Sequence, residues 1–196
     1  MIGLLNGRLL SKDPPHLLLD VGGVGYELEV PLSTFEKLPE AGAHLTLHTH
    51  LTVREDAHIL FAFATLAEKA LFRELIKLNG VGPKLALAIL SGLSVGEFWS
   101  VVRAQDAIRL TKLPGIGRKT AERLVLELKD KAEAHAATPA GEIRGSANRN
   151  LLEARRALEA LGYKPAEAVR MCDDAFKPDM STEQLVREAL KRVARR

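Results

Sequence analysis

The chain has 196 residues, of which 46% are hydrophobic, 27% are charged and only 5% are aromatic. This composition is typical of a folded globular protein and excludes a disordered or collagen-like chain. The single cysteine excludes an internal disulfide, a cysteine-rich zinc site and a four-cysteine iron–sulfur cluster, and it favours the cytoplasm as compartment. Apolar runs are short, and the first residues lack a basic leader, so we expect no membrane span and no secretory signal.

The net charge of +3 conceals an uneven distribution along the chain. Residues 1–64 carry 4 basic and 8 acidic side chains, whereas residues 65–131 carry 12 basic and 7 acidic ones. An acidic first third followed by a basic middle predicts segments with different roles.

Residues 1–64 have the pattern of a small β-domain. Short apolar stretches are broken by Gly and Pro, and residues 22–25 (Gly-Gly-Val-Gly) predict a hairpin turn between two of them. Residues 44–53 and 57–63 have the pattern of further strands, and residues 31–38 that of one short helix. About five short strands with one helix predict a β-barrel of the oligonucleotide/oligosaccharide-binding (OB) type.

From Thr65 onward the apolar spacing becomes helical, which predicts an all-α domain over residues 65–132. Residues 133–148 are rich in small and polar residues without periodicity and predict a flexible linker. Helical patterning resumes over residues 149–196, where Gly162 and Pro165 separate the first two of three expected helices. The predicted fold class is therefore multidomain α+β.

An internal repeat is the strongest signal in the sequence. Residues 78–86 and 113–121 share the pattern Leu-x-Gly-(Val/Ile)-Gly-x-Lys-x-Ala, with an apolar helix behind each copy. Glycines allow close approach of a ligand to the backbone, and the free N–H groups of the following helix, with nearby cations, attract an anion. We therefore expect sequence-independent binding of DNA phosphates through Gly80, Val81, Gly82, Lys84, Gly115, Ile116, Gly117, Arg118, Lys119 and Arg123.

The glycine pattern does not match the common nucleotide-binding loops. Neither copy has the third glycine of a dinucleotide-binding fingerprint, and GxxxxGK[ST] is absent from the sequence, so we expect no ATPase and no cofactor of its own. A turn that merely lets two helices pack closely remains an alternative for one copy. Two equal copies within the most basic segment favour the phosphate site.

Each copy resembles a helix-hairpin-helix motif, and the chain as a whole resembles the RuvA family, whose members are Holliday-junction-binding subunits of the bacterial branch-migration complex. The resemblance runs through MIGLLNGRL, DVGGVGYELEVP and THLTVREDAHILFAF, then LNGVGPKLALAILSGL and LPGIGRKTAERLVLELKDK, to ALEALGYKPAEA, in the same order. It covers nearly the whole chain.

The resemblance implies an N-terminal OB barrel, a central domain with two helix-hairpin-helix motifs and a C-terminal three-helix, ubiquitin-associated-like domain. It implies a non-catalytic homotetramer that holds a four-way junction open and flat, alone or as two tetramers. The C-terminal domain would bind the hexameric ATPase RuvB, which consumes the ATP, and the resolvase RuvC is a further candidate partner. In the family an acidic hairpin tip acts as a pin at the junction centre, and Glu55 and Asp56 match it. A solvated acidic turn is the alternative interpretation of this pair.

Two other functions compete with this hypothesis. A DNA-repair enzyme of the glycosylase kind shares LPGIGRKTA, but the chain lacks iron–sulfur ligands and a Lys/Asp pair behind the hairpin. A single-strand binder using the barrel would need a basic groove and stacking rings, and residues 1–64 are acidic and poor in aromatic residues.

Overall fold

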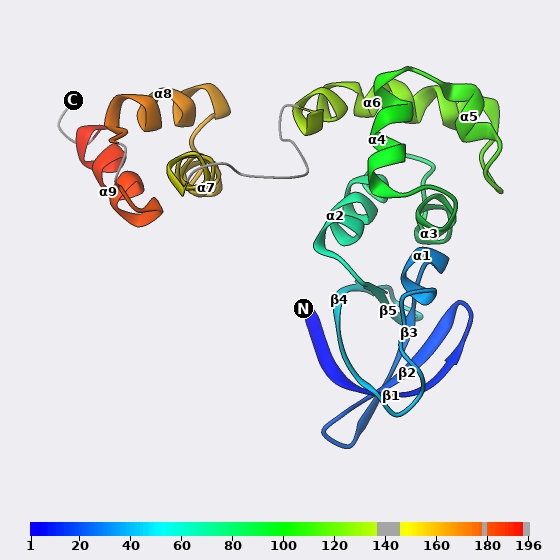
Figure 1. Cartoon of the computed structure of the whole chain (residues 1–196). Coiled ribbons are helices and arrows are strands. Elements are labelled where there is room, and N and C mark those ends of the chain that lie inside the picture. The colour runs from blue at the N-terminus through cyan, green and yellow to red at the C-terminus, as the bar shows by residue number, and fades with distance from the viewer. Residues whose placement is uncertain (137–145, 178–179, 194–196) are drawn as a thin grey trace. The chain divides into compact units, whose positions relative to one another are not determined.

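The computed structural model describes residues 1–136, 146–177 and 180–193. The chain divides into two compact units, Met1–Ala137 and Thr138–Arg196, each of which is treated by itself. In Figure 1 the first unit consists of a β-barrel followed by a group of helices, and the second is a small helical unit.

The barrel confirms the predicted OB-type architecture. Its sheet is closed in the order β1-β2-β3-β5-β4, with β3 and β5 parallel and all other neighbours antiparallel. The strands are β1 Leu4–Asp13, β2 His16–Val21, β3 Val24–Glu29, β4 His44–Val53 and β5 His58–Phe63, and a short helix α1, Leu32–Phe35, follows β3.

Glycines shape two places in the barrel. A Cβ at Gly7 would lie 2.2 Å from the carbonyl oxygen of Asp20, so glycine allows β1 and β2 to approach. The β2–β3 turn consists of Gly22 and Gly23, both in the left-handed region with φ of 63° and 89°. Glycine adopts this conformation without steric cost, which accounts for the predicted hairpin.

Five helices follow the barrel: α2 Leu66–Leu75, α3 Pro83–Gly92, α4 Val95–Arg103, α5 Ala107–Thr111 and α6 Arg118–Ala136. They enclose a hydrophobic core that includes Phe98 and Trp99. Among the described residues no single helix is long and apolar enough to cross a membrane, and α3 and α4 pass that test only as a pair bent by 96°.

Strand β5 joins the barrel to the helices because its two faces belong to different cores. Leu60 and Ala62 face the barrel interior, whereas Phe61 and Phe63 pack into the helical core. The Phe72 ring on α2 lies 5.0 Å from the ring of Phe61 and 4.9 Å from that of Phe63. Aromatic contacts of this kind contribute about 0.5–1.5 kcal/mol each beyond area burial. The barrel and helices therefore form one body, although the sequence pattern changes at residue 65.

The second unit contains three helices, as expected: α7 Ser146–Ala160, α8 Pro165–Ala175 and α9 Thr182–Val193. Gly162 has a φ of 98° directly after α7, and Pro165 is the first residue of α8. Both residues act at the helix boundaries where the sequence predicts them. The buried core consists of Ala154, Leu158, Ala168, Met171, Cys172, Ala175, Leu185 and Ala189.

The predicted linker, residues 133–148, differs from the structure at both ends. Helix α6 continues to Ala136 and α7 begins at Ser146, and residues 137–145 lie outside the described residues. The alanine-rich stretch after Lys131 has high helix propensity, so α6 extends beyond its last periodic apolar residue.

Candidate nucleic-acid interface

The two glycine turns have the same backbone geometry. Gly80 has a φ of 84° and Gly115 a φ of 81°. The next residue in each copy, Val81 or Ile116, is buried at 5% and 6% exposure. Their N–H groups donate to Leu78 O at 3.1 Å and to Leu113 O at 3.2 Å. The apolar side chain therefore anchors each turn in the core, as the repeat predicts.

The first and second glycines of each turn have different reasons to be glycine. Gly80 and Gly115 have positive φ, which other residues adopt only with strain. Gly82 and Gly117 have no positive φ, and a Cβ built on either would meet nothing within 4 Å. The protein's own packing therefore does not require glycine at these two positions. A ligand that lay directly against the main chain of the turn would require it, because a Cβ would occupy its space.

Each turn leads directly into a helix, and the first backbone N–H groups of that helix are left without an intrahelical acceptor. The first intrahelical acceptors are Gly82 O, bonded by Ala86 N at 3.0 Å, and Gly117 O, bonded by Ala121 N at 3.0 Å. N–H groups ahead of these donors have no intrahelical partner. Helix α3 has no side-chain cap, whereas α2 and α4 have capping boxes. Uncapped donors at the positive end of a helix dipole suit a phosphate oxygen.

The basic side chains of the repeats are not equivalent. Lys84 and Lys119 are exposed, and neither forms an ion pair with the described part of the chain. Lys84 also lines a 520 Å³ hollow between α3 and the barrel. Arg118 pairs with Glu122 at 2.9 Å, and this hydrogen bond raises the pKa of the guanidinium. Among the predicted phosphate ligands, Lys84 and Lys119 are thus the cations without an ion-pair partner in the described part of the chain.

Arg123 has a partner inside the protein. Its Nη1 donates to the backbone carbonyl of Asn79 at 3.0 Å, and its Nε lies 3.8 Å from Glu127. The two repeats pack together at another point, since a Cβ at Gly115 would lie 3.3 Å from Leu85 on α3. The structure therefore brings both predicted turns together and uses one predicted phosphate ligand to support the first turn.

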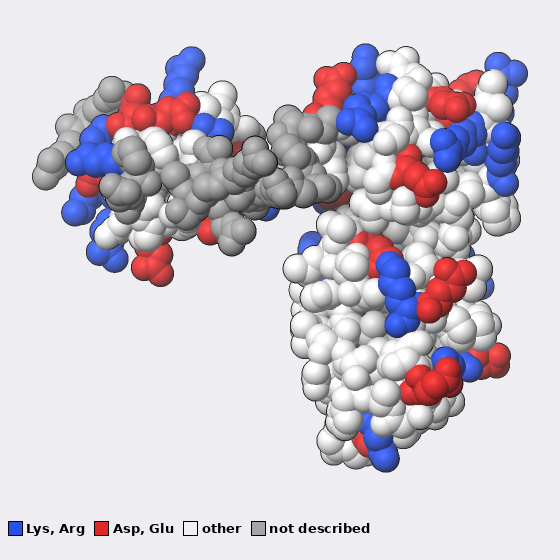
Figure 2. Space-filling view, in the orientation of Figure 1, with Lys and Arg blue, Asp and Glu red and all other residues white. Residues whose placement is uncertain are grey.

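Figure 2 shows how charge is distributed over the first unit. Basic side chains gather over α5 at one end of the helical region, with acidic side chains among them, while much of the barrel surface in this view is uncharged. The charges at this end of the helical region are thus locally mixed. This arrangement agrees with cations that act at particular phosphates rather than with a uniformly basic face.

Glu55 and Asp56 lie in the turn that joins β4 to β5. The Arg54 N–H donates to Ala57 O at 2.8 Å and closes this turn through the backbone. Both carboxylates are exposed, and within the described ranges neither is paired with a basic side chain. The turn therefore does not need its two acidic side chains for its own structure.

Two residues that support the site are absent from the sequence-based predictions. The carbonyl of Asn79, as acceptor for Arg123, has no sequence signal. Glu68 does have one, because Thr65-x-x-Glu68 has the spacing of a capping box. Among the residues that the structure describes, no group of three or more His, Cys, Asp or Glu side chains could hold a metal ion.

A closed OB-type barrel with tandem helix-hairpin-helix motifs defines a class of nucleic-acid-binding architecture. Family profiles described as "RuvA N terminal domain", "SAM-like Helix-hairpin-helix tandem" and "RuvA, C-terminal domain" match residues 1–62, 72–130 and 150–194. The chain is 54% identical to a "Holliday junction branch migration complex subunit RuvA" of Pseudomonas paraeruginosa, over 97% of this chain and 98% of that relative. A protein of the same name from Vibrio parahaemolyticus is 50% identical over the same shares. The chain belongs to the RuvA family.

Proposed function

We propose that this chain binds four-way DNA junctions and holds them open for branch migration, as a subunit without catalytic activity of its own. One observation carries the proposal: two matching glycine turns face open space at Gly82 and Gly117, in one body with a barrel whose acidic turn has no basic partner among the described residues. The phosphate-binding residues are those of the two turns, with Lys84 and Lys119 as direct cations, and Arg123 supports the first turn through Asn79.

The charge distribution supports a four-way rather than a linear substrate. Helix N-termini and lysines attract phosphates without reading bases. Glu55 and Asp56 repel phosphates, and a protein that only held a linear duplex would gain nothing from them. In a homotetramer the acidic turns from four chains would meet near one axis and keep the strands apart at the crossover.

The proposed partners follow from this role. The second unit, a separate compact body, is proposed to bind the ATPase RuvB, which uses ATP to move the DNA arms, so this chain needs no cofactor. A separate unit at the end of a chain gains reach toward a moving partner. One or two tetramers would hold the junction, RuvC would act on the same complex, and the place of action would be the cytoplasm, where chromosomal DNA lies.

Binding to three DNA substrates tests the proposal. Gel-shift affinities for a synthetic four-way junction, a linear duplex and a single strand would be measured at several salt concentrations. We expect the junction to bind most tightly, with log affinity falling by about 0.9 per log unit of salt for each phosphate neutralised. Equal affinity for junction and duplex would overturn the proposal. Excision of a base from any substrate would instead support the glycosylase alternative.

A truncation tests the division of labour between the units. Removing the residues after 148 deletes most of the second unit and leaves the barrel and both turns. We expect junction binding to persist and stimulation of RuvB ATPase activity to disappear. Mass photometry of both forms should give about four times the mass of one chain, which is 21.4 kDa for the full-length protein. Loss of junction binding by the truncated form would contradict this assignment.

A further inference from the structure

A buried carboxylate lies where the barrel meets the helices. Glu68, in the first turn of α2, is only 4% exposed, although it is charged. Burial by itself would raise the pKa of Glu68, but hydrogen bonds from Thr65 and Lys37 outweigh it and hold the pKa below the usual value of 4.5. A buried charge is expensive unless its oxygens are paired. Its partners therefore show what the residue does.

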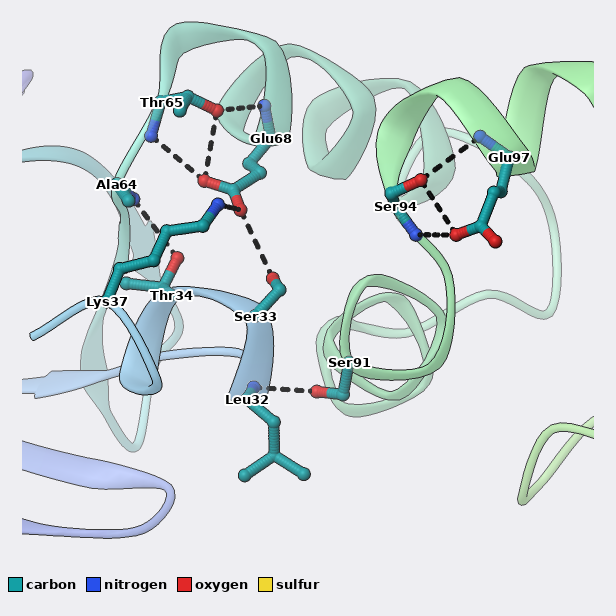
Figure 3. Close-up of polar contacts among 10 residues, drawn as sticks. All are labelled: Leu32, Ser33, Thr34, Lys37, Ala64, Thr65, Glu68, Ser91, Ser94 and Glu97. Carbon is teal, nitrogen blue, oxygen red and sulfur yellow. Dashed lines mark hydrogen bonds and ion pairs between the residues drawn. The ribbon is translucent and has the colours of Figure 1, made fainter.

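The two carboxylate oxygens of Glu68 serve different elements, as Figure 3 shows. Oε2 accepts hydrogen bonds from the backbone N–H of Thr65 at 2.9 Å and from its hydroxyl at 3.0 Å, which closes the capping box of α2. Oε1 accepts from the Ser33 hydroxyl at 3.2 Å and from Lys37 Nζ at 3.2 Å. Ser33 belongs to α1 and Lys37 follows it, so one side chain joins the barrel to the helical region.

Two further hydrogen bonds hold α1, one to the β5–α2 connection and one to α3. The hydroxyl of Thr34, which is fully buried, accepts from the backbone N–H of Ala64 at 3.0 Å. The backbone N–H of Leu32 donates to the Ser91 hydroxyl on α3 at 2.9 Å. Helix α3 is the helix that begins at the first glycine turn. Helix α1, which follows β3, is thus hydrogen-bonded to the start of α2, to the β5–α2 connection and to α3, the helix that carries the proposed phosphate site.

A second capping box in the same unit shows that capping alone does not need this arrangement. Ser94 and Glu97 cap α4 with the same reciprocal bonds. The Ser94 N–H donates to the Glu97 carboxylate at 3.0 Å, and the Glu97 N–H donates to the Ser94 hydroxyl at 3.2 Å. The Glu97 side chain is 54% exposed, and its other partner, Arg109 at 3.7 Å, belongs to the same helical region. Glu68 differs because its second oxygen reaches another part of the fold.

We propose that Glu68, Lys37 and Ser33 are positioning residues that fix the orientation of the glycine turns relative to the barrel, and that this orientation provides the preference for four-way junctions. The inference rests on the proposed function. Phosphate contacts on several arms must be made at once from one assembly, and simultaneous contacts add affinity only when their geometry matches. A linear duplex engages one pair of turns and makes no such demand on the barrel.

A double variant of the barrel side tests the inference without disturbing the cap of α2. Lys37→Met with Ser33→Ala removes both donors to Oε1 and leaves the Thr65–Glu68 capping box in place. The matched control is Glu97→Gln, which alters a capping box that has no contact with the barrel. Junction and duplex affinities of the full-length protein would be measured side by side at one salt concentration.

We expect the double variant to bind the junction about 10-fold more weakly and the duplex within about 2-fold of wild type, because only the multi-arm contacts lose their fixed geometry. Glu97→Gln should leave the ratio of junction affinity to duplex affinity unchanged. Lys37→Arg with Ser33 intact should keep the preference, since it restores a charged donor.

The outcomes separate the inference from the function on which it rests. A wild-type protein without junction preference would overturn the proposed function itself. If wild type prefers the junction and the double variant keeps that preference, the positioning role is wrong and the Phe61–Phe72 and Phe63–Phe72 contacts are sufficient. Equal losses for junction and duplex, together with a lower melting temperature, would show a purely structural role and would also overturn the inference.

Discussion

Arg123 on α6 donates a hydrogen bond from Nη1 to the backbone carbonyl of Asn79, at 3.0 Å, across 44 positions of sequence. The bond ties the helix behind the second glycine turn to the residue that precedes the first one. Arg123, which the repeat predicts to be a phosphate ligand, therefore maintains the spacing of the two turns. The guanidinium is suited to this because its planar fork presents several donors in fixed directions.

Substitution of Arg123 separates its charge from its geometry. We expect Arg123→Lys and Arg123→Met to weaken duplex binding to a similar extent with little change in the salt dependence, because the cation is used within the protein. The side chain is 51% exposed, so the loss of unfolding free energy should stay below about 1 kcal/mol. Gel shifts over a salt series check this. If the slope of log affinity against log salt fell by about 0.9 for Arg123→Met but not for Arg123→Lys, Arg123 would contact a phosphate directly, contrary to this prediction.

Lys84 and Lys119 should show the opposite behaviour. Both are exposed cations beside a glycine turn without a carboxylate partner in the described residues. Replacing either by Ala should lower the slope of log affinity against log salt by about 0.9 and weaken all duplex sequences equally. Thermal unfolding should not change. Unequal losses on duplexes of different sequence would argue against backbone recognition.

The glycines of the turns offer an internal comparison. Gly82→Ala and Gly117→Ala should change the free energy of unfolding by less than about 1 kcal/mol, because a Cβ there meets nothing within 4 Å, and the restricted unfolded chain offsets the poorer N-cap that alanine makes at position 82. They should nevertheless weaken DNA binding, since the Cβ occupies the space of the ligand. Gly80→Ala and Gly115→Ala should cost about 1–2 kcal/mol through their positive φ. Melting temperatures and duplex affinities of all four variants check the contrast, which fails if Gly82→Ala and Gly117→Ala bind as wild type.

Neutralising the acidic turn should change the handling of the junction but not its binding. In Glu55→Gln with Asp56→Asn the turn keeps its backbone closure from Arg54 to Ala57, so folding should be unaffected. Without the negative charges, strands at the crossover are no longer repelled, so strand separation and branch-migration rate with RuvB should change. Unaltered values of both would support a simple solvated turn.

Glu68 should make stability sensitive to acid. Its folded-state pKa is lowered, so its ionised form stabilises the fold above the usual value of 4.5, and this contribution is lost as the pH falls through the folded value. Glu68→Gln does not titrate there, so the difference in melting temperature between wild type and variant should shrink between pH 5 and pH 3. A difference in melting temperature that stays constant over that pH range would contradict the prediction.

Much of the fold was predictable because its signals are local. The alternation along β3 and β4, the paired glycines in the β2–β3 turn and the helical spacing after Thr65 all depend on residues that are close in the sequence. The matching φ values of Gly80 and Gly115 belong to the same category, since a repeated short motif imposes the same backbone. The end of α6 was misplaced because an alanine-rich stretch continues a helix without apolar periodicity.

The sequence by itself determined the barrel, the repeated turns and the three C-terminal helices, through periodicity and the conformational freedom of glycine. Only the tertiary structure decided which side chains remain free at the site. It gave Arg123 a partner at Asn79, buried Glu68 against Lys37, and turned Phe61 and Phe63 toward Phe72. The first two contacts join residues 44 and 31 positions apart, and such pairs form only when packing has placed their elements side by side. Local patterns carry no information about that packing.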